Sequence, residues 1–275
     1  MNGALLIDKP SGPTSHDIVA FARRALKTRE IGHTGTLDPL ATGLLVLLIG
    51  QATRLSQFLV TDEKEYIADV RLGRSTPTYD AQGLETSDAM PEARGAMRDV
   101  TPEQLQAVLA NFIGTFPQLP PPFSAKKVGG VRAYEKARRN ERVDLKPVNV
   151  TVRELELLPA PPASDLAPRG SDATLLRLRV ACSSGFYVRS LAHDIGQRLG
   201  CGAHLEALRR TRAGQFNVAD ALSLEALDGA GAAIGARLVD SNTLLAAMPA
   251  ATRRRKAIGG PGTAIRSGRG TSRLP

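Results

Sequence analysis

Five stretches of this 275-residue chain carry the hydrophobic pattern of β-strands. Residues 4–7 are apolar, and residues 44–49 form a longer apolar run that predicts a strand buried on both faces. Residues 66–72 alternate apolar and polar side chains, which predicts a strand with one face in solvent. The same alternation at 150–158 and at 174–182, around a connection rich in Pro and Ala, predicts an antiparallel pair.

Three other segments show helical spacing instead. Apolar residues recur at that spacing after Ser15, which is the predicted N-cap of the first helix. Residues 101–114 open with Thr-Pro-Glu-Gln, an N-cap followed by a proline and a capping box. Residues 185–200 place Arg189 in the first turn of a helix that ends before a glycine. This mixture of hairpins and isolated helices predicts an α+β fold with a mixed, mostly antiparallel sheet flanked by helices.

Length and composition fit one large domain with at most a small appendage. The longest apolar run is too short to span a bilayer, and the first residues lack the pattern of a signal peptide, so the expected compartment is the cytoplasm. The two cysteines, Cys182 and Cys201, form no CxxC pair and indicate neither a disulfide framework nor a zinc ribbon.

The charge of the chain favours a polyanionic partner. The formal net charge is +9, and the isoelectric point is about 10.0. Basic residues gather at 126–142 and again at 253–273, whereas many acids lie between residues 61 and 103. Charge alone fits a nucleic-acid-binding surface or simply a solvated basic one.

The sequence GHTGTLDPLATG at residues 32–43 carries one acid, Asp38, in a glycine-rich setting. It lacks the GK[ST] ending of a phosphate-binding loop. The four histidines are scattered and no GxSxG sequence occurs, so no metal site or serine triad is predicted. Aspartate before proline is common in turns, where its side chain bonds a backbone amide. Taken alone, this residue favours such a turn.

The longer string GHTGTLDPLATGLL resembles the signature of the TruB family of tRNA pseudouridine synthases. The resemblance continues in order through LLIDKPSGPTSHDIV, GQATRLSQFL, KEYIADVRLG, TPTYDAQG, FSAKKVGGVRAYEKAR, CSSGFYVRSLAHDIGQRLGCGAHLEALRRTRAG and SLEAL, over about residues 4–227. It implies the pseudouridine synthase fold. It also implies the isomerisation of uridine 55 in the T-loop of tRNA, in which uracil is detached at N1 and rejoined through C5.

The resemblance implies roles for particular residues. Asp38 is the catalytic aspartate, as nucleophile or general base, and Arg189 is its ion-pair partner. Tyr66 stacks on the uracil ring and can also accept a proton as a general base. His33 enters the RNA loop as the target base leaves it. The other residues it implies at the substrate are Lys9, Tyr187 and Leu208, and for Lys9 and Leu208 a structural role fits equally well.

Elementary chemistry agrees with these roles. Cleavage of a glycosidic bond builds positive charge at C1′, which a carboxylate stabilises or traps. Asp38 has a reference pKa of about 3.9, and a guanidinium such as Arg189 offsets the effect of burial on it. Tyr66 starts from a pKa of about 10, which a nearby Arg189 would lower. Direct attack at C1′ and proton abstraction at C2′ both remain open. The reaction requires no cofactor, and none is expected.

The predicted organisation is a catalytic domain at 1–230 and a truncated or degenerate C-terminal RNA-binding region at 231–275, with a disordered basic tail. A basic insertion at 118–147 is expected to be mobile until it clasps the T-arm through Lys126, Lys127 and Arg132. Neither a membrane nor an obligate protein partner is expected. Two alternatives remain open, namely a pseudouridine synthase for other RNA and a tRNA-folding chaperone of the same fold.

Overall fold

The computed structural model describes most of the chain, in these ranges: 1–60, 63–83, 100–124, 126–128, 131–132, 139, 145–159, 174–229 and 231–245. The predictions for the connection after residue 159, for much of the basic insertion and for the C-terminal tail lie outside these residues. The mixed, mostly antiparallel sheet with flanking helices is confirmed.

One large sheet organises the described residues. Its strands follow the order β1-β3-β10-β4-β9-β8-β5, with β2 paired to β3 and β11 paired to β10. All its pairs of strands are antiparallel except β3 with β10. The bounds are β1 (Gly3–Lys9), β2 (Ile31–His33), β3 (Thr42–Ile49), β4 (Lys64–Leu72), β5 (Gly114–Gln118), β8 (Val148–Leu158), β9 (Leu175–Cys182), β10 (Ala203–Ala213) and β11 (Phe216–Asn217). A separate small hairpin joins β6 (Lys127–Val128) and β7 (Val131–Arg132).

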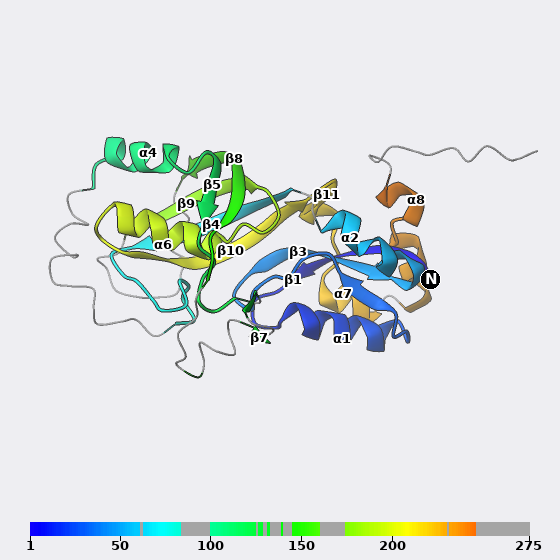
Figure 1. Cartoon of the computed structure of the whole chain (residues 1–275). Helices are drawn as coiled ribbons and strands as arrows, with labels where there is room; N and C mark the ends of the chain where they lie inside the picture. Colours follow the sequence, from blue (N-terminus) through cyan, green and yellow to red (C-terminus); the bar gives the residue numbers. More distant parts are fainter. Residues whose placement is uncertain are drawn as a thin grey trace, which may run out of the picture.

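The helices cover the two halves of this sheet (Figure 1). Helices α4 (Pro102–Ala110) and α6 (Val188–Arg198) lie over the half that contains β4, β5, β8 and β9. Helices α1 (Ser15–Ala25) and α7 (Leu224–Gly229) lie beside β1 and β3. The shorter elements are α2 (Ser56–Leu59), α8 (Ser241–Leu244) and the 3-10 helices η1 (Gly50–Leu55), η3 (Val218–Asp220) and η4 (Gly231–Arg237).

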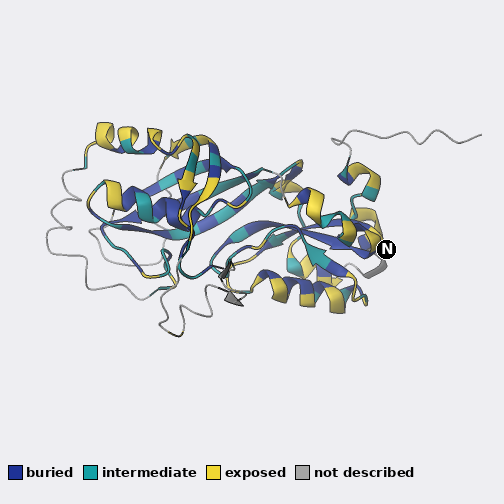
Figure 2. Ribbon diagram, viewed as in Figure 1, coloured by how far each residue is buried: buried dark blue, intermediate teal, exposed yellow. Residues whose placement is uncertain are grey.

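Strand β3 has hydrophobic clusters on both faces, as its unbroken apolar run predicts. Leu45, Leu47 and Ile49 belong to the larger cluster. The alternate residues Leu44 and Leu48 belong to a second cluster on the opposite face. Buried residues dominate the central strands, and exposed ones lie on the outer helices (Figure 2). The strand after the Asp38 segment is therefore fixed from both sides.

The N-cap of α1 is Thr14, so the prediction of Ser15 was wrong by one residue. The Thr14 side chain accepts from the amide of Asp17, and the Asp17 carboxylate accepts from the amide of Thr14, which completes a capping box. Ser15 is buried, and its hydroxyl both donates to the carbonyl and accepts from the amide of Leu37. This residue therefore ties α1 to the segment that carries Asp38. The capping box predicted at Thr101 is confirmed.

The polar face of β4 is not in solvent, contrary to the prediction. Asp69 is 7% exposed and accepts two hydrogen bonds from Arg177 of β9, at 2.7 and 2.9 Å. Arg71 is 5% exposed and lies 2.9 Å from a carboxylate oxygen of Glu206 in β10. Alternation marks a two-faced strand, but it does not show that the neighbouring strands supply matching charges that cover the polar face.

The segment from η4 to α8 packs back onto the sheet. Val239 exchanges two backbone hydrogen bonds with Ala4 of β1, at 2.9 and 2.8 Å. Leu222 does the same further along β1, where its amide donates to Leu6 and its carbonyl accepts from Asp8. Ile234 and Leu244 are buried. The boundary at residue 230 stays a prediction.

The two halves of the sheet meet in a narrow parallel contact between β3 and β10. Only two residue pairs form it, Arg209 with Thr42 and Arg210 with Gly43. Gly43 has a φ of +94°, and a Cβ at this position would collide with the carbonyl oxygen of Arg210. The last glycine of GHTGTLDPLATG is therefore required by close backbone approach.

We expect Gly43→Ala to lower the free energy of unfolding by about 3 kcal/mol, because it adds both backbone strain and overpacking. Urea unfolding of the purified protein measures the change. Gly32→Ala in β2 is the matched control, since no atom lies within 4 Å of its added Cβ. We expect this control to change the free energy of unfolding by less than about 1 kcal/mol. Equal effects of the two substitutions would contradict the interpretation.

Candidate active site

Asp38 lies in the loop between β2 and β3, and Lys9 of β1 binds the backbone of this loop. The Lys9 side chain is fully buried at the end of β1. Its ammonium donates to the carbonyls of Pro10 at 2.8 Å and Ala41 at 2.7 Å, and more distantly to that of Pro39. Burial lowers the pKa of Lys9 to about 8, although the charge of Asp38 opposes the shift. These contacts are those of a structural support for the loop.

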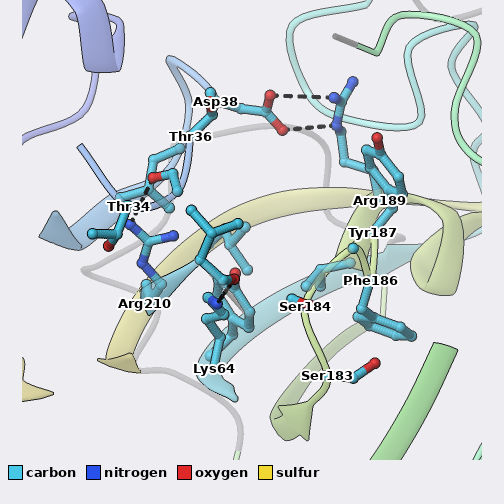
Figure 3. A pocket seen from close by; sticks show the side chains of 17 residues that line it. Thr34, Thr36, Asp38, Lys64, Ser183, Ser184, Phe186, Tyr187, Arg189 and Arg210 are labelled. Atoms are coloured by element: carbon cyan, nitrogen blue, oxygen red, sulfur yellow. Dashed lines mark hydrogen bonds and ion pairs between the residues drawn. The ribbon is translucent and has the colours of Figure 1, made fainter. Parts of the chain in front are cut away.

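Arg189 of α6 holds the Asp38 carboxylate with two nitrogen atoms (Figure 3). The Nε atom lies 2.9 Å from Oδ2, and Nη2 donates to Oδ1 at 3.2 Å. The Arg189 side chain is 7% exposed, whereas that of Asp38 is 37% exposed. A planar guanidinium in this arrangement fixes the direction of a carboxylate as well as its position. One edge of the acid therefore remains open to a bound molecule.

Other groups fix Arg189 in turn. Its Nη1 donates to the carbonyl of Thr78 at 3.2 Å, and its Nη2 donates to that of Phe123 at 3.1 Å. The carboxylate of Asp80, which is 3% exposed, lies 3.4 Å from Nη1. Asp80 accepts from the hydroxyl of Thr78, so the turn itself orients the second acid.

Sequence reasoning missed Asp80. In TPTYDAQG it reads as ordinary turn chemistry, and only the folded chain brings it to Arg189. The first residues of the predicted insertion pack on α6. The hydroxyl of Ser190 donates to the carbonyl of Leu119, next to the contact of Phe123 with Arg189.

Opposing influences set the pKa of Asp38. Burial raises this pKa above its ordinary value. The charge and hydrogen bond of Arg189 lower it, Asp80 raises it further, and Lys9 lowers it. Burial outweighs the cations, so the pKa of Asp38 stays above its ordinary value, and Arg189 is the group that lowers it most.

A pocket of about 280 Å³ opens beside the ion pair, at the lower limit of small-molecule sites. It brings together five of the predicted residues, namely Asp38, Tyr66, Tyr187, Arg189 and Leu208. It also contains two cations that sequence reasoning did not single out, Lys64 and Arg210. Lys9 and His33 are not among the lining residues. The remaining walls are largely apolar or small: Thr34, Gly35, Thr36, Leu37, Val60, Ser183, Ser184, Gly185, Phe186 and Val188.

Tyr66 is near a guanidinium, but not the one expected. Burial raises the pKa of Tyr66, and the opposing effect comes from Arg210, through its charge and hydrogen bonding. Arg189 is not among the groups that act on this phenol. Arg210 stands directly opposite Tyr66 in the antiparallel ladder between β10 and β4, a register that local sequence does not reveal.

His33 comes before Asp38 in the sequence, and Tyr187 comes after it. His33 ends β2, where its Nδ1 accepts from the amide of Gly35 and its ring meets His16 edge-on, with ring centres 5.6 Å apart. Burial, with His16 and Arg210 nearby, lowers the pKa of His33, which favours the neutral ring. Tyr187 lines the pocket, and the amide side chain of Gln118 bonds both its N–H and its carbonyl.

Less can be described of the predicted basic residues. The ammonium of Lys126 donates to the carbonyl of Lys146 at 3.4 Å. Lys127 and Arg132 pair in register across the hairpin of β6 and β7, and their side chains lie outside the described residues. Among the helices of the described residues, none has the length and apolar character that crossing a bilayer needs.

Solved structures of similar architecture come from H/ACA ribonucleoprotein complexes. One is the archaeal box H/ACA Nop10-Cbf5 complex, with 29% identity and a TM-score of 0.55 over 82% of this chain and 52% of that chain. Another is an H/ACA ribonucleoprotein bound to a substrate RNA containing 2′-deoxyuridine, with 26% identity and a TM-score of 0.57 over 88% of this chain and 57% of that chain. This chain thus spans little more than half of those longer ones. Its fold and its sequence similarity place it in the class of pseudouridine synthases.

Sequence relatives narrow this class. Residues 23–188 match the TruB family pseudouridylate synthase N-terminal domain, and residues 189–248 match the tRNA pseudouridylate synthase B C-terminal domain. The tRNA pseudouridine synthase B of Solibacter usitatus is 47% identical over 90% of this chain and 80% of its own length. That of Aquifex aeolicus is 48% identical over 82% of this chain and 73% of its own. The chain belongs to the TruB family.

We expect Arg189→Gln to shift the acid limb of the pH dependence of kcat/KM upward by about one pH unit or more. Without the guanidinium, the Asp38 carboxyl ionises only at higher pH, and the buried Asp80 repels it. The loss of activity should therefore be largest at acid pH and shrink as the pH rises. Pseudouridine formation on tRNA transcripts, measured across pH, gives the profile.

Arg198→Gln is the matched control, because Arg198 ends the same helix but is exposed and lies over the ring of Phe112. It should leave the profile in place. An Arg189→Gln profile that is lowered equally at every pH would show that the arginine does not act through the ionisation of Asp38.

Proposed function

We propose that this protein converts uridine 55 in the T-loop of tRNA to pseudouridine. The observation that carries the proposal is the Asp38 carboxylate, fixed by Arg189 at the edge of a pocket in a chain of the TruB family. The reaction cleaves the bond between N1 of uracil and C1′ of ribose, turns the base and forms a bond from C5 to C1′. Atoms are conserved, so the side chains of the pocket supply all the assistance.

Asp38 stabilises the charge that develops at C1′. As the glycosidic bond breaks, the sugar becomes positive, and a nearby carboxylate either lowers the energy of this state or bonds to the carbon. Attack at C1′ and proton abstraction at C2′ both use the same ionised oxygen. Arg189 keeps that oxygen ionised and correctly aimed, while one edge of the acid stays free for the substrate.

Tyr66 acts on the base. Its ring lies in the same pocket, where it stacks on uracil while the base turns. After the base has rejoined through C5, that carbon still holds its original hydrogen. The phenolate form of Tyr66 removes this proton and becomes the phenol, and the electron pair of the C–H bond restores the C5–C6 double bond. The electrons of the C6–N1 double bond return to N1, which takes up a proton from solvent.

The substrate enters by base flipping. A uridine inside a folded RNA loop cannot reach Asp38 unless it leaves its stack, at a cost of a few kcal/mol. The neutral ring of His33, at the end of β2 and outside the pocket lining, fills the gap that the base leaves. Tyr187 and Leu208 then contact the flipped nucleotide from α6 and β10.

The names of the sequence relatives favour tRNA over other RNA as the substrate. Those near 47% identity are named for tRNA, whereas the H/ACA proteins are below 30% identity and are about one and a half times as long. The T-arm lies against the basic insertion, where Lys126, Lys127 and Arg132 neutralise its phosphates. A function limited to folding tRNA does not require Asp38, Arg189 and Asp80 to be held together.

We expect Asp38→Asn to reduce kcat by about 10⁴-fold or more, since it removes the charge that stabilises C1′. Unmodified tRNA transcripts are incubated with each protein, and pseudouridine is mapped at single-nucleotide resolution. The wild type should modify position 55, and the variant should bind tRNA with normal affinity. Asp220→Asn, at an exposed aspartate in η3, is the matched control and should keep full activity. Product at another position, or full activity of Asp38→Asn, contradicts the proposal.

We expect replacement of Lys126, Lys127 and Arg132 by Ala to reduce the slope of log Kd against log salt concentration by about two units. Each lost phosphate contact lowers this slope by somewhat less than one unit. Binding of tRNA is measured at several salt concentrations. A variant with Arg153, Arg198 and Arg237 replaced by Ala loses the same formal charge and should keep a steeper slope. Identical slopes for the two variants would exclude the insertion as the T-arm contact.

A further inference from the structure

Arg210 lies deep in the pocket and faces the same side of the sheet as Tyr66. The two residues are direct partners in the antiparallel ladder between β10 and β4, and directly opposite residues project from the same face. Both line the pocket, and Arg210 is 2% exposed. In Figure 3 it approaches the loop from the strand below, on the other side of the pocket from Arg189.

The Arg210 guanidinium ties together the two ends of the Asp38 loop. Its Nε donates to the carbonyl of Leu44 at 2.7 Å, and its Nη2 donates to that of Gly35 at 3.2 Å. Gly35 precedes Asp38 by three residues, and Leu44 follows it on β3. The backbone of Arg210 also meets Gly43 where β10 pairs in parallel with β3.

No carboxylate of the described residues forms an ion pair with Arg210. The two comparable arginines differ in this respect, because Arg189 is balanced by Asp38 and Asp80, and Arg209 holds Asp8 at 3.0 and 2.7 Å. Burying a guanidinium against neutral carbonyls alone is unfavourable. Its positive charge is therefore available to a group that becomes negative in the pocket.

Tyr66, which stands opposite Arg210 in the ladder and lines the same pocket, carries a phenol that can become negative. Burial raises the pKa of Tyr66, Arg210 lowers it, and Cys182 of β9 and Asp38 of the loop raise it. Lys64, on the same strand, also lines the pocket, with its ammonium bonded to the carbonyl of Val60. Among the groups that act on this phenol, Arg210 is the main influence that favours its ionised form.

We propose that Arg210 is a positioning residue that joins the Asp38 loop to the Tyr66 strand and stabilises negative charge on the Tyr66 phenol oxygen. The chemical part rests on the proposed function. The phenol first gives its proton to solvent, and the phenolate then takes the proton from C5, as described above. Arg210 exchanges no proton in either step. It makes the first step easier and sets the distance between phenol and carboxylate.

Ionisation of Tyr66 is measured directly in the free enzyme. The chain has only four tyrosines, so fluorotyrosine incorporation gives a fluorine NMR spectrum in which Tyr66→Phe identifies the signal of Tyr66. We expect Arg210→Gln to reduce the ionisation constant of this phenol about tenfold or more, and Arg210→Lys to recover part of the loss. Arg209→Gln, one residue along on the opposite face, is the matched control and should leave the signal unchanged. A Tyr66 titration that is the same in Arg210→Gln and wild type overturns the proposal.

A kinetic cycle tests the same coupling. At saturating tRNA and neutral pH, Arg210→Gln should lower kcat about tenfold, with a smaller change in KM, and the loss should diminish as the pH rises. In a Tyr66→Phe background, the same substitution should lower the residual single-turnover rate by less than about twofold. An equal loss in both backgrounds would show that Arg210 only supports the loop, and would overturn the part of the proposal that concerns Tyr66.

These outcomes are separable from failure of the proposed function. If the wild type formed no pseudouridine in tRNA, the fluorine NMR titration would still decide whether Arg210 governs Tyr66. If Arg210→Gln unfolded the protein, Arg210→Lys would supply both measurements, because it keeps the charge but changes its position. A folded Arg210→Lys variant with a wild-type Tyr66 titration and a wild-type kcat would contradict the role of the guanidinium geometry.

Discussion

The ion pair between Asp38 and Arg189 is the interaction on which the rest of the site depends. Its partners are 151 residues apart, one in a loop of the first half of the sheet and the other at the start of a helix on the second half. The Arg189 side chain is 7% exposed, so removing Asp38 would leave a largely buried charge that keeps its desolvation penalty. The geometry of the pocket and the contact between the two halves are therefore stabilised by the same ion pair.

The absence of other charge in GHTGTLDPLATG follows from the way this loop is held. Its carbonyl oxygens accept from cations that come from elsewhere, Lys9 at Pro39 and Ala41 and Arg210 at Gly35. Basic side chains within the loop would compete for those oxygens and repel the buried cations. Further acids would compete with Asp38 for Arg189. The small residues of the loop let its backbone oxygens come close to the cationic side chains of other strands. Asp38 is then the single carboxylate that carries the negative charge of the loop.

Local signals in the sequence predicted the elements whose causes are local. The apolar run of β3, the capping box at Thr101 and the helix that carries Arg189 all have that character. Motif resemblance supplied Asp38, Tyr66 and Arg189, but only the fold reveals Asp80 and Arg210 as their neighbours. The same limit explains the buried charges of β4 and the true place of Ser15. Strand register and pairing across more than a hundred residues decide these contacts, and neither leaves a periodic trace in the chain.

The outer side of β1 shows how this sheet ends. A terminal strand with free amide and carbonyl groups is a template on which another chain can add a strand. Here Leu222 and Val239 occupy those groups at both ends of β1, using only short stretches of extended backbone. Leu222 and Val239 thus also keep the edge of β1 from pairing with another copy of the chain, a protection that does not depend on RNA.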